Sequence, residues 1–167
     1  MWKLTDYISE SQISLGIGIL GMPGAAAYGG LVDTLRPLKG ETIFVSAAAG
    51  AVGGLVGQLA KALYDCNVIG SCGGFQKSKM IKEEWGFDHA IDYKTCNSKE
   101  DLVAALKKVA PNGINMYFEN VGGIHFAAAM DVLAPKGRVA VCGQIDNYND
   151  ADPHTCAFYP MRMIYTS

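Results

Sequence analysis

The sequence predicts an α/β protein of the Rossmann type, with a doubly wound parallel sheet in the strand order 3-2-1-4-5-6. Short β-branched runs alternate along the chain with helical patterns of roughly ten residues, which favours parallel strands joined by helices. A turn of small residues, Ala47-x-x-Gly50-x-x-Gly53, connects the first strand of this series to its helix. Right-handed crossovers then make that strand order the natural choice.

Turn and capping residues set the boundaries of the first elements. Pro23 stands near the start of the first helix, where its missing N–H costs no hydrogen bond. The β-branched Val68 and Ile69 indicate the second strand of the sheet, which ends at Gly73, and Gly86 stops the following helix. We therefore expect, in order, a helix at 25–35, a strand at 42–46, a helix at 55–64, a strand at 67–72, a helix at 76–85 and a strand at 90–93.

The second half of the chain continues the alternation. Ser98 and Asp101 form a capping-box pattern ahead of an apolar helical face that includes Leu102 and Leu106. Breaks containing proline and glycine separate the later elements. We expect a helix at 102–109, a strand at 114–119, a helix at 124–133, a strand at 138–142 and, after a polar loop at 147–154, a strand at 162–166.

The composition is typical of one intracellular domain. The 167 residues are half hydrophobic, which is enough to bury a single core. The net charge is −2 and the 14 basic residues are scattered, so we expect no nucleic-acid partner. The five cysteines contain no C-x-x-C pair, which favours reduced thiols in a cytoplasmic protein. The apolar run at 13–24 lacks a basic flank and is too short to span a bilayer, so we expect neither a signal peptide nor a membrane partner.

The small-residue turn is the strongest candidate for a binding site. The helix after it directs free N–H groups and the positive end of its dipole at the turn, so a pyrophosphate fits there. The backbone of this turn would lie against the phosphates, with Gly53 leaving space for them. The alternative is a tight β-to-α turn without a ligand. Several residues at or just past expected strand ends fall at this same edge of the sheet: Gly50, Cys72, Tyr93, Asn120 and Gly143.

The end of the second strand indicates which nucleotide would bind. NAD-binding folds carry Asp or Glu there to hold the ribose 2′-hydroxyl, but residues 71–77 contain no acid. Lys77 is the first charge after the strand, and its ammonium would attract a 2′-phosphate. We therefore expect NADP(H), and the missing acid also argues against a methyltransferase that uses S-adenosylmethionine. The alternative interpretation of Lys77 is a solvated lysine in the first turn of a helix.

No metal site is expected. His89, His125 and His154 have no second ligand at a metal-binding spacing and are interpreted as surface or hydrogen-bonded residues. Asp92 and Glu119 are strand residues to which we assign no catalytic role.

Five motifs together resemble one family in their order and spacing. This family is the zinc-independent medium-chain dehydrogenase/reductases, and specifically their prostaglandin reductase branch (leukotriene B4 12-hydroxydehydrogenase, 15-oxoprostaglandin 13-reductase). The resemblance covers essentially the whole chain. The motifs are Gly21-Met-Pro-Gly24 with Ala27-Tyr28, the turn at 47–53, Gly86-Phe-Asp88 with Tyr93-Lys94, Asn120-Val-Gly-Gly123, and Cys142-Gly-Gln-Ile145 with Tyr148-Asn149.

The resemblance implies NADPH-dependent reduction of a carbon–carbon double bond conjugated to a ketone or aldehyde. Gly50, Ala51, Val52 and Gly53 match family residues that would hold the pyrophosphate. Lys77 and Tyr93 match family residues that hold the 2′-phosphate. Tyr148 would be the catalytic hydrogen-bond donor near the substrate carbonyl, in competition with a ribose hydroxyl of the cofactor or a mere packing role. The residues that match the nicotinamide side of the site are Asn120, Cys142, Gly143, Gln144, Ile145 and Tyr148.

The chain departs from the family in two respects. Ala26 stands where the family often has Thr, and family members are about twice as long. The resemblance therefore implies an NADP-binding domain over 1–167, with residues 1–22 leading into it and the substrate domain and C-terminal segment of the family absent. We expect a homodimer that acts on a small enone or enal. The alternatives are an NADP(H)-binding module or sensor without turnover, a quinone oxidoreductase-like enzyme, and a relative that kept the fold but lost the site.

Overall fold

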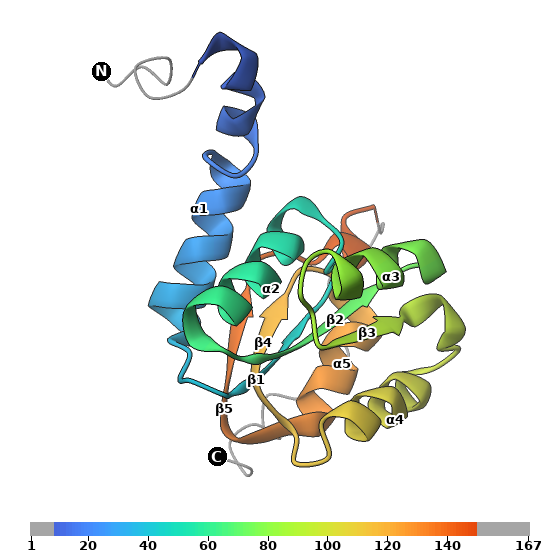
Figure 1. Ribbon diagram of the computed structural model, residues 1–167. Helices are drawn as coiled ribbons and strands as arrows, with labels where there is room; N and C mark the ends of the chain where they lie inside the picture. The colour runs from blue at the N-terminus through green and yellow to red at the C-terminus, as the bar shows by residue number, and fades with distance from the viewer. Residues whose placement is uncertain (1–8, 150–167) are drawn as a thin grey trace.

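The computed structural model describes residues 9–149, and a five-stranded parallel sheet runs through it (Figure 1). The strand order is β3-β2-β1-β4-β5 and every neighbouring pair is parallel. This confirms the predicted fold class and the predicted order of five strands, whereas the sixth strand expected at 162–166 lies outside the described residues. The strands are β1 (Thr42–Val45), β2 (Asn67–Cys72), β3 (His89–Asp92), β4 (Ile114–Glu119) and β5 (Leu133–Val141).

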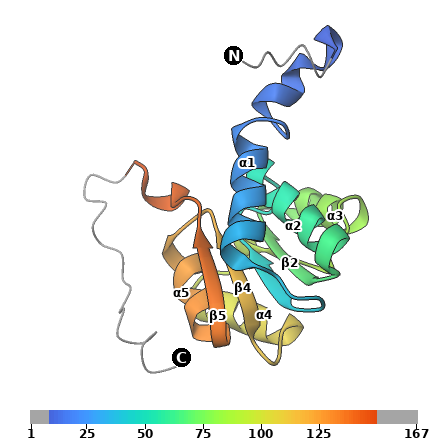
Figure 2. The ribbon, with the colours of Figure 1, turned by 90° about the vertical axis from the view of Figure 1, so that its left-hand side faces the viewer.

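Helices cover both faces of the sheet, as expected for a doubly wound fold (Figure 2). On one face, α1 (Met22–Tyr28), the π-helical segment η3 (Gly29–Leu35), α2 (Ala51–Tyr64) and α3 (Phe75–Glu83) share one hydrophobic core. On the other face, α4 (Lys99–Val109) and α5 (Gly123–Val132) form a second core. Three short 3-10 segments complete the described chain: η2 (Glu10–Ile17), η4 (Tyr93–Thr95) and η5 (Ile145–Asn147).

The central strands are buried on both faces, which explains why their sequences are continuous apolar runs rather than alternating patterns. Residues Ile43 to Val45 are fully buried, and so is most of β4. Phe44 and Tyr117 stack across β1 and β4, with ring centroids 5.1 Å apart and planes 11° from parallel. This burial fixes the carboxyl ends of β1 and β4 beside one another.

The helices begin earlier than predicted because their first turns are polar or small and lack the apolar period. α2 begins at Ala51 rather than at residue 55, directly after its N-cap Gly50. α4 begins at Lys99 rather than at residue 102. Its capping box is confirmed: the Asp101 N–H donates to Ser98 Oγ at 3.2 Å, and the Ser98 N–H donates to Asp101 Oδ2 at 3.1 Å.

The helix predicted at 25–35 is two segments of different winding. α1 begins at Met22, with Pro23 in its first turn, and the chain continues from Gly29 as the π-helical η3. A Cβ on Gly30 would lie 2.5 Å from the Phe118 ring, so the glycine allows this segment to approach β4 closely. The segment ends at Arg36, whose φ is +49°.

Strand β5 begins five residues earlier than predicted and is irregular. Leu133 pairs with Ile114, and the next pair is Arg138 with Met116, so residues 134–137 bulge out of the ladder. The turn predicted at 135–137 is this bulge, in which Lys136 has a φ of +61°.

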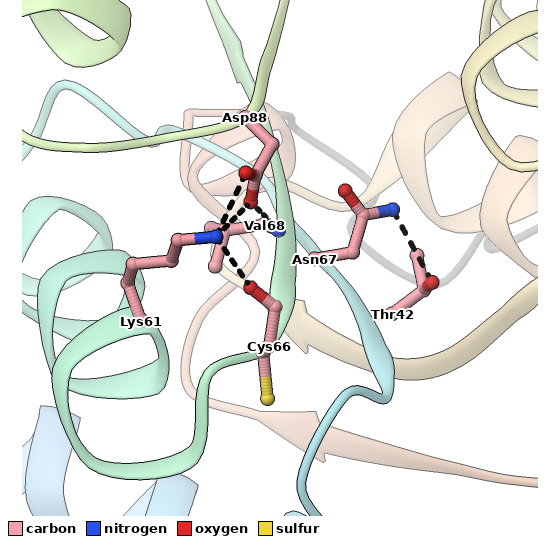
Figure 3. A network of polar contacts seen from close by, with 6 residues as sticks. All are labelled: Thr42, Lys61, Cys66, Asn67, Val68 and Asp88. Atoms are coloured by element: carbon pink, nitrogen blue, oxygen red, sulfur yellow. Dashed lines mark hydrogen bonds and ion pairs between the residues drawn. The ribbon is translucent and has the colours of Figure 1, made fainter.

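A network of hydrogen bonds and one ion pair connects the amino end of β2 to its neighbours (Figure 3). Lys61 Nζ, on α2, donates to Asp88 Oδ1 at 2.8 Å and to the carbonyl oxygen of Cys66 at 3.3 Å. Asp88 Oδ2 accepts the Val68 N–H at 2.7 Å. Burial raises the pKa of the Cys66 thiol to about 11, so it stays protonated at neutral pH. The network holds α2 and the β2–β3 pair together at the edge of the sheet opposite the glycine turn.

The N-terminal segment projects past the carboxyl edge of the sheet, away from the body of the molecule (Figures 1 and 2). Its apolar side chains are exposed, among them Ile17 at 83% and Met22 at 73%. No single helix between residues 9 and 149 is long and apolar enough to cross a bilayer. The two stretches Ser11–Ile17 and Met22–Leu35, bent by 51°, meet that test only as a pair and only by length and composition.

Candidate functional site

The carboxyl end of β1 leads into the glycine turn. Ala47 adopts a φ of +49°, and its carbonyl accepts the Gly50 N–H at 2.9 Å, which closes the turn. Gly50 is the N-cap of α2 and no side chain caps this end of the helix. Gly50 and Ala51 are exposed, so the unpaired N–H groups of the first helical turn face solvent. This arrangement suits an anionic group such as a phosphate.

The turn itself also requires glycine at residue 53, apart from the predicted space for a phosphate. A Cβ at this position would lie 2.5 Å from the Ala47 carbonyl oxygen, so the turn's own backbone, before any ligand, demands glycine. Further along α2, a Cβ on Gly54 or Gly57 would collide with the Trp85 or Phe87 ring at 2.5 and 1.9 Å. These glycines let α2 pack against the loop that follows α3.

The turn after β2 contains a carboxylate that comes from β3. Asp92 pairs with Cys72 across the two strands, and its Oδ1 accepts the Gly74 N–H at 2.8 Å and the Lys94 N–H at 3.1 Å. Gly74 has a φ of +97°, which favours glycine there. Residues 71–77 contain no acid, as the sequence analysis noted, yet an acid from the neighbouring strand holds this turn in place.

Two polar side chains lie against the bare backbone of Gly73, and a lysine is exposed on the helix that follows it. A Cβ built on Gly73 would lie 3.0 Å from both the Tyr93 hydroxyl and Lys94 Cε. Lys77 is exposed on the first turn of α3. Among residues 9–149, neither lysine forms an ion pair. The end of β2 therefore has two unpaired cations and a phenol.

A buried carboxylate connects β1, β4 and the turn before α5. Glu119 is fully buried and accepts hydrogen bonds from Ser46 Oγ at 3.1 Å, from the Tyr117 hydroxyl at 2.7 Å and from the Gly122 N–H at 2.9 Å. The Val121 N–H donates to the same carboxylate. Burial, followed by the charge of Glu119, raises the pKa of Tyr117, so this phenol stays protonated and donating.

His125, on the first turn of α5, is buried rather than at the surface. Its side chain is 4% exposed, and Nε2 has no hydrogen-bond partner among the described residues. The Tyr93 ring meets the imidazole edge-on, with centroids 5.2 Å apart. Burial lowers the pKa of His125 against the opposing charges of Glu119 and Asp146, which favours a neutral imidazole.

Asn120 stands where β1, β4 and the loop after β5 meet. Its Nδ2 donates to the Ser46 carbonyl at 2.7 Å, and its backbone N–H donates to Ser46 Oγ at 2.8 Å. Its own carbonyl accepts the Ile145 N–H at 3.3 Å. The Asn120 side chain thus ties β4 to the end of β1, beside the glycine turn.

The loop after β5 returns to the end of β4. The Cys142 and Gly143 N–H groups both donate to the Glu119 carbonyl, at 2.9 and 3.2 Å. The Gln144 N–H donates to the Tyr148 hydroxyl at 3.1 Å, and the Tyr148 side chain is 66% exposed. Since this hydroxyl accepts a hydrogen bond from its own loop, its proton is free to be donated elsewhere.

A pocket of about 250 Å³ opens between α1, η3 and β5. Ala26 and Cys142 line this pocket. Ala26 stands where the family named in the sequence analysis often has threonine. The remaining lining residues are Gly30, Thr34, Phe118, Ala140 and Val141. The pocket is mostly apolar and adjoins the loop that contains Gly143.

The structure brings the predicted residues to one edge of the sheet. Gly50 to Gly53, Lys77, Tyr93, Asn120 and the loop Cys142 to Tyr148 all follow the carboxyl ends of strands. The part of the chain that the structure describes has no group of three or more His, Cys, Asp or Glu side chains that could hold a metal ion. His154 and Cys156 lie outside the described residues.

Sequence reasoning missed three features of this edge. Lys94 directly follows Tyr93, but its approach to Gly73 depends on the fold. Asp92 could have been found, because the predicted order places the end of the third strand beside the end of the second. His125 was taken for an ordinary surface or hydrogen-bonded residue, and only the packing of α5 shows its burial.

The chain belongs to the zinc-binding dehydrogenase family, which it matches over residues 51–166. Its relatives include a NADP(+)-dependent 2-alkenal reductase from Nicotiana tabacum, 52% identical over 89% of this chain and 42% of the relative. Prostaglandin reductase 1 from Bos taurus is 45% identical over 90% of this chain and 44% of the relative. The chain therefore spans less than half the length of these relatives.

Solved structures share the fold. CurA from Vibrio vulnificus, in complex with NADPH, superposes with a TM-score of 0.79 at 46% identity, over 85% of this chain and 41% of CurA. A quinone oxidoreductase from Pseudomonas syringae superposes with a TM-score of 0.71 at 27% identity, over 86% of this chain and 41% of that protein. The likeness to CurA is the stronger of the two in both sequence and fold.

Proposed function

We propose that this chain is the cofactor-binding part of an NADPH-dependent reductase that reduces the carbon–carbon double bond of enones and enals. The observation that carries the proposal is the arrangement of groups at the carboxyl ends of β1 and β2. There, the N-terminus of α2, which no side chain of the described residues caps, lies at the same edge of the sheet as Lys77 and Lys94, neither of which forms an ion pair among residues 9–149. The identity to the tobacco alkenal reductase and to bovine prostaglandin reductase 1 supports the same function.

The residues present fit NADPH. The backbone of Gly50, Ala51, Val52 and Gly53 would hold the pyrophosphate, since this helix end has free N–H groups. Lys77 and Tyr93 would hold the 2′-phosphate. The residues on the nicotinamide side would be Asn120, Cys142, Gly143, Gln144 and Ile145, which follow the ends of β4 and β5.

When bound, NADPH supplies a hydride to the carbon β to the substrate carbonyl. Negative charge then develops on the carbonyl oxygen, and a hydrogen bond donated to that oxygen lowers the barrier. Tyr148 is the candidate donor of this chain, because its exposed hydroxyl accepts the Gln144 N–H and can donate its own O–H to the substrate. Asn120 and Ser46 would keep the crevice in shape through their mutual hydrogen bonds.

Two other functions have specific support. A nucleotide-binding module without turnover is consistent with the described residues, which form only the cofactor side of a cleft. A quinone oxidoreductase is supported by the Pseudomonas syringae structure, although at 27% identity against 46% for CurA. As in its relatives, the partner would be a small molecule, and we propose a homodimer.

Titration of NADPH and NADH tests cofactor binding. The chain should bind NADPH at least about tenfold more tightly, because each charge-assisted contact to a phosphate contributes about 1.4 kcal/mol. Lys77→Ala should lower this preference by about tenfold, and Lys107→Ala, an exposed lysine on α4, should not change it. Equal affinity of the wild-type chain for both cofactors would contradict the assignment of NADPH.

Turnover separates enone reduction from the other two functions. The chain would replace the corresponding region of the tobacco 2-alkenal reductase, and the hybrid would be assayed with a small conjugated enone and with benzoquinone. Enone reduction at the rate of the tobacco enzyme is the expected result. A hybrid that reduces only the quinone, or that binds NADPH without turnover, would contradict the proposal.

A further inference from the structure

Lys94 is a second cation at the end of β2. It belongs to η4, the 3-10 turn that follows β3, whereas Lys77 belongs to α3. The two lysines therefore reach this region from two different elements of the chain.

The position of Lys94 is set by a hydrogen-bonded frame. Asp92 Oδ1 accepts both the Lys94 N–H and the Gly74 N–H, so one carboxylate joins the start of η4 to the β2–α3 turn. The Lys94 stem crosses Gly73, with Cε 3.0 Å from where a Cβ would stand. The Tyr93 hydroxyl lies at the same distance from that point. A Cβ at residue 73 would press on the ends of both side chains, so glycine lets both lie against the backbone here.

The two lysines and one carboxylate of this region leave an excess of positive charge. Asp92 is the carboxylate at this turn, and between residues 9 and 149 it forms no ion pair with either lysine. Both lysines are exposed. A phosphate monoester carries a charge of about −1.5 to −2 at pH 7 and has three acceptor oxygens, so it complements two ammonium groups and a phenol.

We propose that Lys94 determines cofactor specificity, by closing with Lys77 a two-sided clamp on the 2′-phosphate of NADPH. The proposal rests on the function proposed above and extends it to a residue on the β3 side. Lys77 approaches the phosphate from α3, Lys94 approaches it across Gly73, and the Tyr93 hydroxyl donates between them. Each lysine contributes separately, because the two stems come from different elements.

Two nucleotides that differ only in the 2′-phosphate test the clamp. The probes are 2′,5′-ADP and 5′-AMP, titrated calorimetrically into the intact chain and into the variants Lys94→Ala, Lys94→Arg, Lys77→Ala and the double alanine variant. Lys94→Ala should weaken 2′,5′-ADP binding about tenfold and leave 5′-AMP binding unchanged. Lys94→Arg should retain most of the affinity, and the double variant should bind both probes equally.

The control and the salt dependence separate the clamp from general electrostatic attraction. Lys107→Ala, on α4, should change neither affinity. Added salt should weaken 2′,5′-ADP binding more in the wild-type chain than in Lys94→Ala. Two results would overturn the role of Lys94 and leave the proposed function intact. In the first, Lys94→Ala weakens the binding of both probes equally. In the second, Lys94→Ala changes neither affinity although Lys77→Ala selectively weakens 2′,5′-ADP binding. A wild-type chain that binds neither probe would overturn both.

Discussion

His125 shows how burial decides the charge of a single residue. Its imidazole lies under the Tyr93 ring and is 4% exposed, with Nε2 unpartnered within the described chain. Burial lowers its pKa, and the carboxylates of Glu119 and Asp146 oppose this shift only in part. The folded state therefore holds a neutral histidine where the unfolded chain binds a proton below about pH 6.5.

This difference predicts a loss of stability in acid. As the pH falls through 6.5, the unfolded state takes up a proton that the folded state does not, so the free energy of unfolding decreases. His125→Leu should remove this contribution and flatten the change in unfolding free energy between pH 7.5 and pH 5.5, measured by urea denaturation. His89→Gln, on β3, is the matched control and should keep the wild-type slope. An unchanged slope in His125→Leu would show that other groups cause the acid sensitivity.

Gly53 separates a structural from a binding role of the glycine turn. A Cβ there would lie 2.5 Å from the Ala47 carbonyl oxygen, whereas a Cβ on the exposed Gly50 would lie 3.1 Å from the same atom. We expect Gly53→Ala to lower the unfolding free energy by about 1–3 kcal/mol through this overpacking, and Gly50→Ala to lower it less. Chemical denaturation without cofactor measures both. Native stability combined with lost NADPH binding in Gly53→Ala would instead support a requirement imposed by the phosphate.

At the scale of the elements, Glu119 joins β1, β4 and the turn before α5. Its carboxylate accepts four hydrogen bonds in a fully buried position. Glu119→Leu leaves these donors without an acceptor and should lower the unfolding free energy by at least about 3 kcal/mol. Glu119→Gln keeps one carbonyl oxygen and should cost less. Equal unfolding free energies for the two variants would mean that solvent satisfies the donors instead.

The elements differ in how well the sequence predicts them. The limits of β2 and β4 are confirmed, because turn residues bound their buried apolar runs. The starts of α2 and α4 were placed late, because their first turns are small or polar and lack the apolar period by which a helix is recognised. The π-helical winding of η3 and the bulge of β5 depend on packing against β4, which no local pattern reveals.

For the molecule as a whole, the sequence predicted the edge where the site lies but not the contacts within it. Strand order and the glycine turn bring the strand ends together, and this part of the prediction is confirmed. The contacts within this edge join residues that lie 18 to 32 positions apart in the sequence. They are the hydrogen bond from Gly74 to Asp92, the approach of Lys94 to Gly73 and the ring contact of Tyr93 with His125. Such contacts depend on strand register and turn geometry, and these cannot be predicted from the type of any one residue.

The carboxyl edge is bordered by an apolar surface that the described residues do not cover. Between residues 13 and 22, the side chains of Ile13, Ile17, Ile19, Leu20 and Met22 are each more than half exposed. The segment that contains them projects beyond the carboxyl edge of the sheet, where we place the cofactor (Figure 2). Contiguous exposed apolar surface favours association. We therefore expect the isolated 167-residue chain to form a dimer or a larger species, and Ile17→Lys with Met22→Lys to shift it towards the monomer in light scattering.

The same isolated chain should bind NADPH but reduce enones negligibly. Catalysis needs one wall to position the nicotinamide and a second to hold the enone within about 3–3.5 Å of the hydride while excluding water. In the function proposed above, the described residues would build the first wall, and the chain spans 42% of the tobacco reductase. Cofactor fluorescence should therefore report NADPH binding, while NADPH consumption with a conjugated enone stays near the rate without protein. Turnover of about 1 s⁻¹ or more, within the ordinary range of enzymes, would show that this chain alone forms a complete cleft.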